Sequence, residues 1–231
     1  LLFSLSPIAI YFQRRVLLDN LMIFWILLSM WLLLKEKFTL LNVYLSSLAF
    51  GIAVLTKENA IFFFPAFLYL LYEKAHSFHR RFAMLKWLFI SVSIVSLYIV
   101  YALLKSELFP QGFLGDSTQH VSLLGTLEEH SGRGSSLPFW NPRSDFYLSF
   151  QGWIHRDPYL VYGGITAYVL GLVLAIKEKS FRIPLLMTAF GMSFLLRGKL
   201  VIEFYVIPMI PLFALLIGMV IDSFSKFLSF K

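Results

Sequence analysis

The sequence predicts an all-α membrane protein, a polytopic bundle of about seven to eight transmembrane helices. Of its 231 residues 58% are hydrophobic and only 14% are charged, and the mean hydropathy is +0.76. Soluble domains carry about 25% charged residues. The long apolar runs lack the alternation of barrel strands, so helices are the spanning elements that satisfy the backbone in lipid. The absence of cysteine excludes disulfides and cysteine-based metal sites.

The expected spans are apolar runs long enough, or nearly long enough, to cross a bilayer. They are a partial segment at 1–12 and segments 19–34, 39–55, 59–73, 86–104, 159–176, 183–196 and 200–222. The two shortest, 59–73 and 183–196, suggest tilted or re-entrant helices. Because the chain opens on LLFSLSPIAI without an initiator Met, we expect 1–231 to be one domain of a protein that is truncated at its N-terminus.

The distribution of charge predicts the orientation. Connections 35–37, 73–86 and 177–182, together with the tail after Asp222, hold 11 of the 20 Lys and Arg residues. By the positive-inside rule they are cytoplasmic, because only five others lie in short segments at the opposite helix ends. The net charge of +7 is therefore attributed to membrane anchoring, and no nucleic-acid partner is expected. Nine of the 13 acidic residues fall on the external side, which favours a site there.

The connection 105–158 is a predicted external loop of about fifty residues, a length typical of functional loops. Its second half suggests an amphipathic helix at 144–154 lying on the membrane surface. Four aromatic residues there suit an interfacial belt: Trp140, Trp153, Tyr159 and Tyr162.

The stretch 13-QRRVLLDNLMIFW-25 places charges at the head of a predicted membrane helix. Arg15 and Asp19 are four residues apart and can pair on one helix face. Alternatively, Arg14 or Arg15 contacts an anionic ligand while Asp19 orients it, because charges in such a position need a partner or a function.

The stretch 55-LTKENAIFFFP-65 allows two interpretations. One is a tight turn capped by Thr56, with Glu58 favoured at a helix N-terminus and Asn59 beside it. That turn does not account for Lys57, whose charge opposes this end of the helix dipole. The other interpretation is a phosphate site, in which Lys57 and free backbone N–H groups bind the anion.

The stretch 196-LRGKLVIEFYVIPMIP-211 adds two cations, Arg197 and Lys199, at another external helix end. Glu203 can pair with Lys199 at i, i+4, and Tyr205 lies close by. Pro208 and Pro211 predict a kinked helix that leaves room for a lipid chain.

Polar residues in the long loop are acceptor-binding candidates, although a solvated loop is the simpler alternative. They are His130, Arg133, His155 and Arg156. No paired-His, GxGxxG, Walker or GxSxG motif is present, so no metal, no cofactor and no cytosolic nucleotide chemistry are expected.

Three of these stretches, in this order, resemble the GT-C membrane glycosyltransferases related to protein O-mannosyltransferases and lipid A aminoarabinose transferases. SPIAIYFQRRVLLDNLMIFW resembles their third-helix region, LAFGIAVLTKENAIFFFP the next motif and FYVIPMIPLFALLIG the closing helix. By the family spacing, Arg14 and Asp19 occupy the positions of the family arginine and aspartate.

The resemblance implies a multi-pass protein of the plasma membrane that transfers a sugar from a polyprenyl-phosphate donor to a protein, lipid or glycan acceptor on the external face. Donor phosphate binding falls to Arg14, Lys57, Arg197 and Lys199. Asp19, Glu58, Asn59, Glu203 and Tyr205 orient the site. The family's catalytic carboxylate usually lies in the first external loop, which we expect upstream of residue 1, so no base is assigned. On this view Lys57→Ala abolishes transfer without unfolding the protein.

Two alternatives remain open: a transporter or flippase of a lipid-linked glycan, and a non-catalytic membrane subunit of a glycan assembly system. A transporter is expected to carry ionisable groups near the midplane and repeated halves. The charges here lie at helix mouths and no repeat is visible in the sequence, which favours the enzyme.

Overall fold

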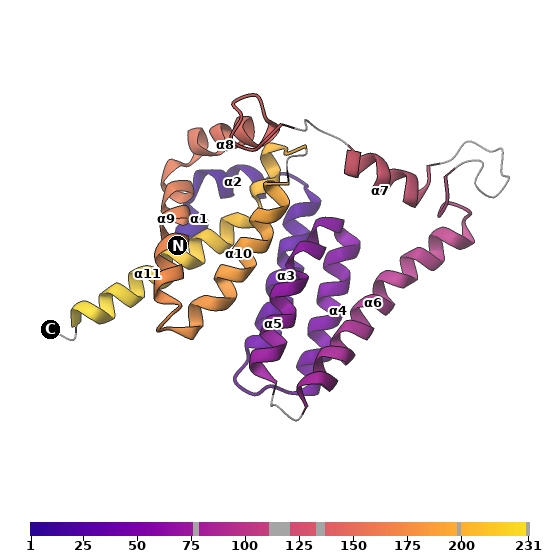
Figure 1. Ribbon diagram of the computed structural model, residues 1–231, viewed down its shortest axis with the longest axis horizontal. Helices are drawn as coiled ribbons and strands as arrows, with labels where there is room; N and C mark the ends of the chain where they lie inside the picture. The colour runs from indigo at the N-terminus through magenta and orange to yellow at the C-terminus, as the bar shows by residue number, and fades with distance from the viewer. Residues whose placement is uncertain (76–78, 111–120, 133–136, 198–199, 230–231) are drawn as a thin grey trace.

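The chain folds entirely into helices over the residues that the computed structural model describes, which are 1–75, 79–110, 121–132, 137–197 and 200–229 (Figure 1). The all-α class predicted from the sequence is therefore confirmed. The elements are α1 (Leu2–Leu5), α2 (Pro7–Gln13), α3 (Leu18–Leu34), α4 (Leu40–Thr56), η1 (Glu58–Phe63), α5 (Phe64–Lys74), α6 (Arg80–Leu104), α7 (Leu123–Gly132), α8 (Asp145–Arg156), α9 (Pro158–Leu174), η2 (Lys179–Phe181), α10 (Arg182–Leu195), η3 (Glu203–Val206) and α11 (Met209–Ser229).

The helices form two groups that meet along α10. In the first group α4 packs against both α3 and α6, and α5 contacts α3 and α6. In the second group α9 and α11 pack together and α10 contacts both. Because α10 also contacts η1 and α5, it joins the second group to the first.

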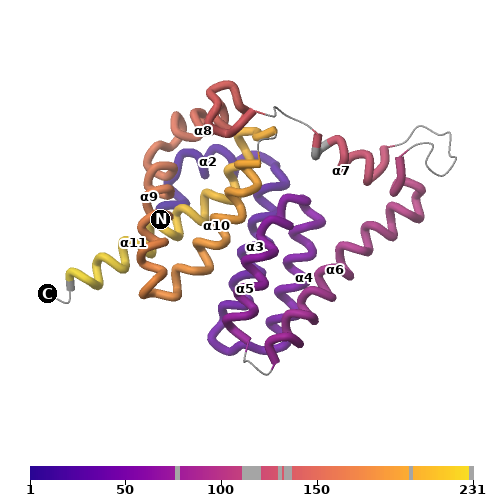
Figure 2. Tube along the Cα trace, in the orientation of Figure 1, coloured from indigo at the N-terminus to yellow at the C-terminus, as the bar shows by residue number. Residues whose placement is uncertain are grey.

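Two short helices run across one end of these groups. α2 is bent by 110° from α3, and α8 is bent by 113° from α9. Both lie at the top of Figure 2, whereas the C-terminal ends of α3 and α5 lie at the bottom. The helix expected at 144–154 is thus confirmed as α8, Asp145–Arg156. Trp153 does not join an interfacial belt, because it is 2% exposed and its Nε1 donates to the Glu203 carbonyl over 2.7 Å.

Side-chain caps explain where several of these helices begin. Ser6, Thr39, Ser144 and Asp157 each accept a hydrogen bond from the backbone N–H three residues on, at 2.9–3.2 Å. Such a bond satisfies one of the N–H groups that a helix start leaves without a partner. Proline follows two of these caps, at a position where its missing N–H costs nothing.

The interface of α3, α4 and α6 combines stacked aromatic rings with small polar residues. Trp87 is fully buried, and its ring lies 4.8 Å from that of Phe50 and 5.6 Å from that of Phe67. Its Nε1 donates to Ser46 Oγ over 3.0 Å, and Ser46 also meets Ser29 Oγ at 2.8 Å. Each buried polar group of this interface therefore has a partner, as burial requires.

The described residues contain fewer candidate spans than the seven to eight that the sequence predicted. Two helices are long and apolar enough to span a membrane, α6 and the stretch Glu203–Leu228, and the number rises to four if each bent pair is one span. The prediction was wrong because several apolar runs are broken or short. Segment 59–73 is divided between η1 and α5, and α10 has only 14 residues.

The surface of α6 supports a membrane location. This helix has 25 residues, about 37 Å at 1.5 Å per residue, which exceeds the roughly 30 Å of a hydrocarbon core. Only 17% of its most apolar window is buried, and Phe89, Leu97 and Leu104 are 70%, 68% and 80% exposed. A patch of this size suits lipid rather than water.

The contact between α9 and α11 yields a test of the fold. A Cβ at Gly164 would lie 2.3 Å from Cγ and 2.6 Å from Cβ of Phe213, whereas one at Gly218 of α11 would have nothing within 4 Å. We expect Gly164→Ala to destabilise the protein by about 1–3 kcal/mol through overpacking. Gly218→Ala is the control and should be neutral or stabilising by up to about 1 kcal/mol. Thermal unfolding in detergent measures both, and equal midpoints would contradict the close approach.

Candidate functional site

A buried ion pair joins α3 to the end of α4. Lys57 Nζ lies 2.6 Å from Oδ2 and 2.8 Å from Oδ1 of Asp19, and the two side chains are 12% and 3% exposed. Asp19 stands in the first turn of α3, where a carboxylate is favoured by the helix dipole. The pair links residues 38 positions apart and fixes the start of one helix to the end of the other.

The pair corrects the sequence interpretation of the first charged stretch. Arg15 does not meet Asp19, because its guanidinium donates to the Tyr11 hydroxyl and lies 4.2 Å from the centre of that ring. Arg14 is exposed at the end of α2 and has no contact with Asp19 or Lys57 among the described residues. Asp19 therefore orients a lysine and not the neighbouring arginines.

The backbone around Lys57 explains why a lysine is tolerated at this turn, which the turn interpretation of the sequence did not. α4 ends at Thr56, whose hydroxyl donates to the Ile52 carbonyl over 2.8 Å and does not cap the next helix. Lys57 follows in an extended conformation, and its N–H donates to the Ala53 carbonyl over 3.0 Å. Its charge thus lies at the negative end of the α4 dipole, where a cation is stabilised.

Two aromatic rings of η3 lie against the same ammonium. Lys57 Nζ is 4.5 Å from the centre of the Tyr205 ring and 5.2 Å from that of Phe204. Both distances are within the range of a cation–π interaction. η3 carries these rings just ahead of α11. Pro208 precedes α11 and Pro211 lies in its first turn, so the two prolines stand where α11 begins and not inside a longer α-helix that they would kink, which is what the sequence predicted.

A cleft of about 500 Å³ opens beside the pair. Its lining comes from three separate parts of the chain around positions 56–62, 197–202 and 205, with one residue each from α3 and α7. The lining residues are Leu18, Thr56, Lys57, Glu58, Asn59, Ile61, Phe62, Leu127, Arg197, Leu200, Ile202 and Tyr205. The cleft therefore gathers two cations, a carboxylate and an amide beside an apolar wall. That wall combines residues far apart along the chain, such as Leu18, Leu127 and Ile202, so no local pattern predicts it.

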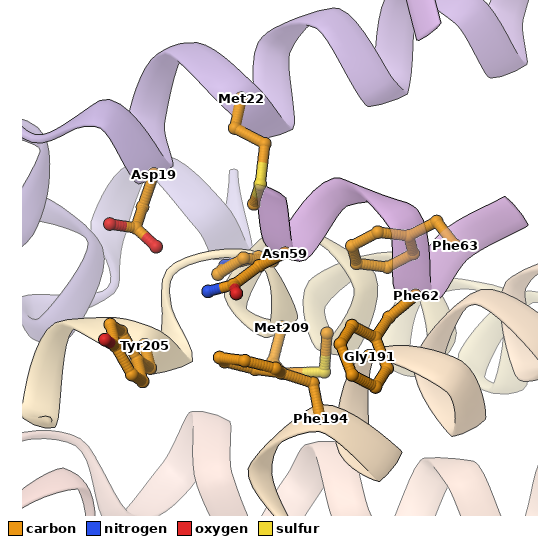
Figure 3. A pocket seen from close by; sticks show the side chains of 10 residues that line it. Asp19, Met22, Asn59, Phe62, Phe63, Gly191, Phe194, Tyr205 and Met209 are labelled. Carbon is orange, nitrogen blue, oxygen red and sulfur yellow. The ribbon is translucent and has the colours of Figure 1, made fainter. Parts of the chain in front are cut away.

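A much smaller cavity adjoins the cleft and shares Asn59, Phe62 and Tyr205 with it (Figure 3). Its volume of about 10 Å³ is close to the minimum for one water molecule. Asp19, Asn59 and Tyr205 form its polar end, and Phe62 and Phe194 belong to the apolar side. The buried Asn59 side chain lies between Asp19 and Phe62 in Figure 3, so a substitution of Asn59 would alter the surroundings of both side chains.

Arg197 is the cation of the cleft that stands outside an ion pair among the described residues. It follows α10, is exposed, and its guanidinium lies 4.2 Å over the Phe194 ring. Although the residue as a whole is exposed, partial desolvation of its guanidinium lowers the pKa of Arg197. Interactions with Tyr205 and Glu58 raise that pKa in part, and an arginine stays charged in proteins. Lys199, the neighbouring cation of the sequence prediction, lies outside the described residues.

Glu203 and Arg156 form a separate pair on the flank of the site. Their side chains meet at 2.5 Å, and the Arg156 guanidinium lies 4.2 Å over the Tyr11 ring. Among the described residues Glu203 thus pairs with Arg156 of α8, whereas Lys199, the partner expected at i, i+4, lies outside them. Nearby, the Ser6 hydroxyl donates to Asp157 Oδ2 over 2.5 Å and ties α2 to the α8–α9 junction. Asp157 also caps α9, and the Asp-Pro sequence at 157–158 is the pattern from which this cap could have been predicted.

Of the remaining loop candidates, His155 is the one whose side chain the structure describes. His155 is exposed on α8 and does not line it. His130 belongs to α7, but its side chain, like Arg133, lies outside the described part of the chain. Within that part, no group of three or more His, Asp or Glu side chains is placed to hold a metal ion.

Comparison with protein-family models, with curated protein sequences and with solved structures gave no match to this chain. The family resemblance therefore depends on the sequence motifs alone.

The ion pair leads to a double-mutant test. Lys57→Met leaves the Asp19 charge buried without a partner and should destabilise the protein by about 3–5 kcal/mol. Asp19→Asn combined with Lys57→Met should cost clearly less than the sum of the two single changes, because neither buried charge remains. Thermal unfolding of the four proteins in detergent measures the coupling.

Arg15→Met is the control, since it removes an exposed arginine and should change stability by no more than about 0.5 kcal/mol. Additive effects of the two changes at Asp19 and Lys57 would show that the pair is not a stabilising unit.

Proposed function

We propose that the protein is an integral membrane glycosyltransferase that moves a sugar from a polyprenyl-phosphate donor to an acceptor. The observation that carries the proposal is the cleft of about 500 Å³, in which Lys57, Arg197 and Glu58 converge beside an apolar wall. A lipid-linked sugar phosphate likewise combines a charged part, the phosphate, with an apolar part, the hydrocarbon chain. The motifs that resemble GT-C enzymes supply two sides of this cleft.

The proposed chemistry needs positive charge at one point. The acceptor hydroxyl attacks the anomeric carbon, the bond from that carbon to the phosphate oxygen breaks, and the phosphate leaves with the electron pair. A base takes the hydroxyl proton. Cationic groups aimed at the leaving phosphate lower the barrier because charge grows there.

Within this proposal the two cations have different roles. Both Asp19 oxygens already contact Lys57, so its ammonium is positioned and largely neutralised. Arg197 presents a planar guanidinium that suits two parallel hydrogen bonds to phosphate. We assign the main phosphate contact to Arg197, a supporting one to Lys57, and orientation of the sugar to Glu58 and Asn59.

The positions of the charged groups favour an enzyme over a transporter. The cleft lies where α4 ends and η1 begins, at the end of the bundle that α2 and α8 cross (Figure 1). A transporter is expected to hold its ionisable groups near the midplane on broken helices. We propose that this end of the bundle faces outside and that the end rich in lysine and arginine faces the cytoplasm.

Arg197→Ala is the variant that tests this function. We expect it to lower transfer from a radiolabelled polyprenyl-phosphate sugar by about 100- to 1000-fold in the purified protein, the usual effect of removing one donor to a developing anion. Its melting temperature should stay near that of the wild type, because Arg197 is exposed.

Arg143→Ala is the matched control, because Arg143 is an exposed arginine outside the lining of the cleft and outside the residues that the resemblance assigns to the donor. It should retain activity within about twofold, an expectation that follows from its having no contact in the cleft. Equal losses in the two variants, or no transfer by the wild type from any of several polyprenyl-phosphate sugars, would overturn the proposal. Lys57→Ala is less informative, since its effect on stability would mask its effect on transfer.

A further inference from the structure

A second cavity, of about 430 Å³, lies at the opposite end of the bundle from the cleft. Its walls come from the last turns of α3 and α5, from η2 and the start of α10, and from the middle of α11. It thus opens between the two groups of helices, at the end of the bundle where α3 and α5 terminate (Figure 1). Neither the motifs nor the proposed transfer reaction uses this cavity.

The cavity is divided into an apolar wall and a basic rim. Seven of its eleven lining residues are Met, Leu, Ile or Pro, among them Leu70, Ile183 and Met219. Lys74 and Lys179 stand at the rim, both exposed, one from each group of helices. Neither lysine has an ion pair or hydrogen bond among the described residues.

The other polar groups around the rim leave it positive. Glu73 and Ser180 also line the cavity, so the lining carries two positive charges and one negative charge. Glu178, next to Lys179, already accepts a hydrogen bond from the Ser223 hydroxyl over 2.6 Å. A ligand of the cavity therefore meets hydrocarbon on one side and, on the other, a net positive edge with a free hydroxyl.

We propose that this cavity binds an anionic phospholipid of the surrounding leaflet. Its phosphate would contact Lys74 and Lys179, and its acyl chains would cover the apolar wall between α5 and α10. The volume is within the range of small-molecule sites. Basic pockets between membrane helices on the side where Lys and Arg collect are suited to anionic headgroups. A zwitterionic lipid fills the apolar part but gains less from the rim.

The proposed lipid bridges the two groups of helices, because Lys74 belongs to α5 and Lys179 to η2. Binding only to the folded protein raises its apparent stability in proportion to the logarithm of ligand concentration. Phosphatidylglycerol should thus raise the melting temperature of the purified protein more than phosphatidylcholine at the same concentration. Native mass spectrometry should show retained phosphatidylglycerol.

The decisive variant is Lys74→Gln combined with Lys179→Gln. We expect it to weaken phosphatidylglycerol binding at least tenfold and to leave the response to phosphatidylcholine unchanged. The matched control is Lys37→Gln combined with Lys177→Gln, which removes two exposed lysines in the predicted cytoplasmic connections, outside the cavity lining. The control should bind phosphatidylglycerol as the wild type does.

A second variant tests the apolar part without a change of charge. Ser180→Trp places a large ring at the cavity and should also abolish the preference for phosphatidylglycerol. An equal loss of phosphatidylglycerol binding in the two double variants would show that exposed lysines attract anionic lipid wherever they lie, which would overturn the proposal. The same holds if inorganic phosphate alone reproduces the stabilisation, or if the two lipids bind equally well to the wild type.

Discussion

The polar end of this protein depends on the buried contact between Asp19 and Lys57. A carboxylate buried among apolar helices is costly unless an opposite charge meets it, so the contact fixes where α3 begins relative to where α4 ends. Once Lys57 is held there, the chain turns into η1 and places Glu58 and Asn59 in the lining of the cleft. The rings of Phe204 and Tyr205 complete the enclosure of the ammonium and bring η3 to the same place.

Hydrogen bonds around α2 and α8 extend this arrangement across the end of the bundle. Asp157 caps α9 and accepts from Ser6 at the start of α2, so one carboxylate joins the α8–α9 bend to α2. Arg156, one residue earlier, contacts both Glu203 and the Tyr11 ring. The segments that surround the cleft are therefore linked by polar contacts at helix ends and not by loops alone, which suits a site that needs fixed geometry.

The two ends of the bundle differ in how they use charge. At the end that α2 and α8 cross, the cations Lys57 and Arg156 are matched with carboxylates and Arg197 rests on an aromatic ring. At the other end, Lys74 and Lys179 are exposed beside an apolar cavity. Paired charges position groups for a specific ligand, whereas unpaired lysines near lipid attract anionic headgroups. The same difference underlies the two proposals made for this chain.

The sequence by itself determined the helical class, the apolar surface of α6, the amphipathic helix α8 and the importance of Lys57, because composition and periodicity depend only on neighbours along the chain. It overestimated the number of spans, since apolar composition does not reveal that the run 59–73 is divided between η1 and α5 or that α10 has only 14 residues. The partners of Asp19, Arg15 and Glu203 were decided only by the tertiary structure. For Asp19, helical spacing offers Arg15 as a partner four residues away, but the fold brings Lys57 to it instead, because pairing the two charges offsets the cost of removing both from water.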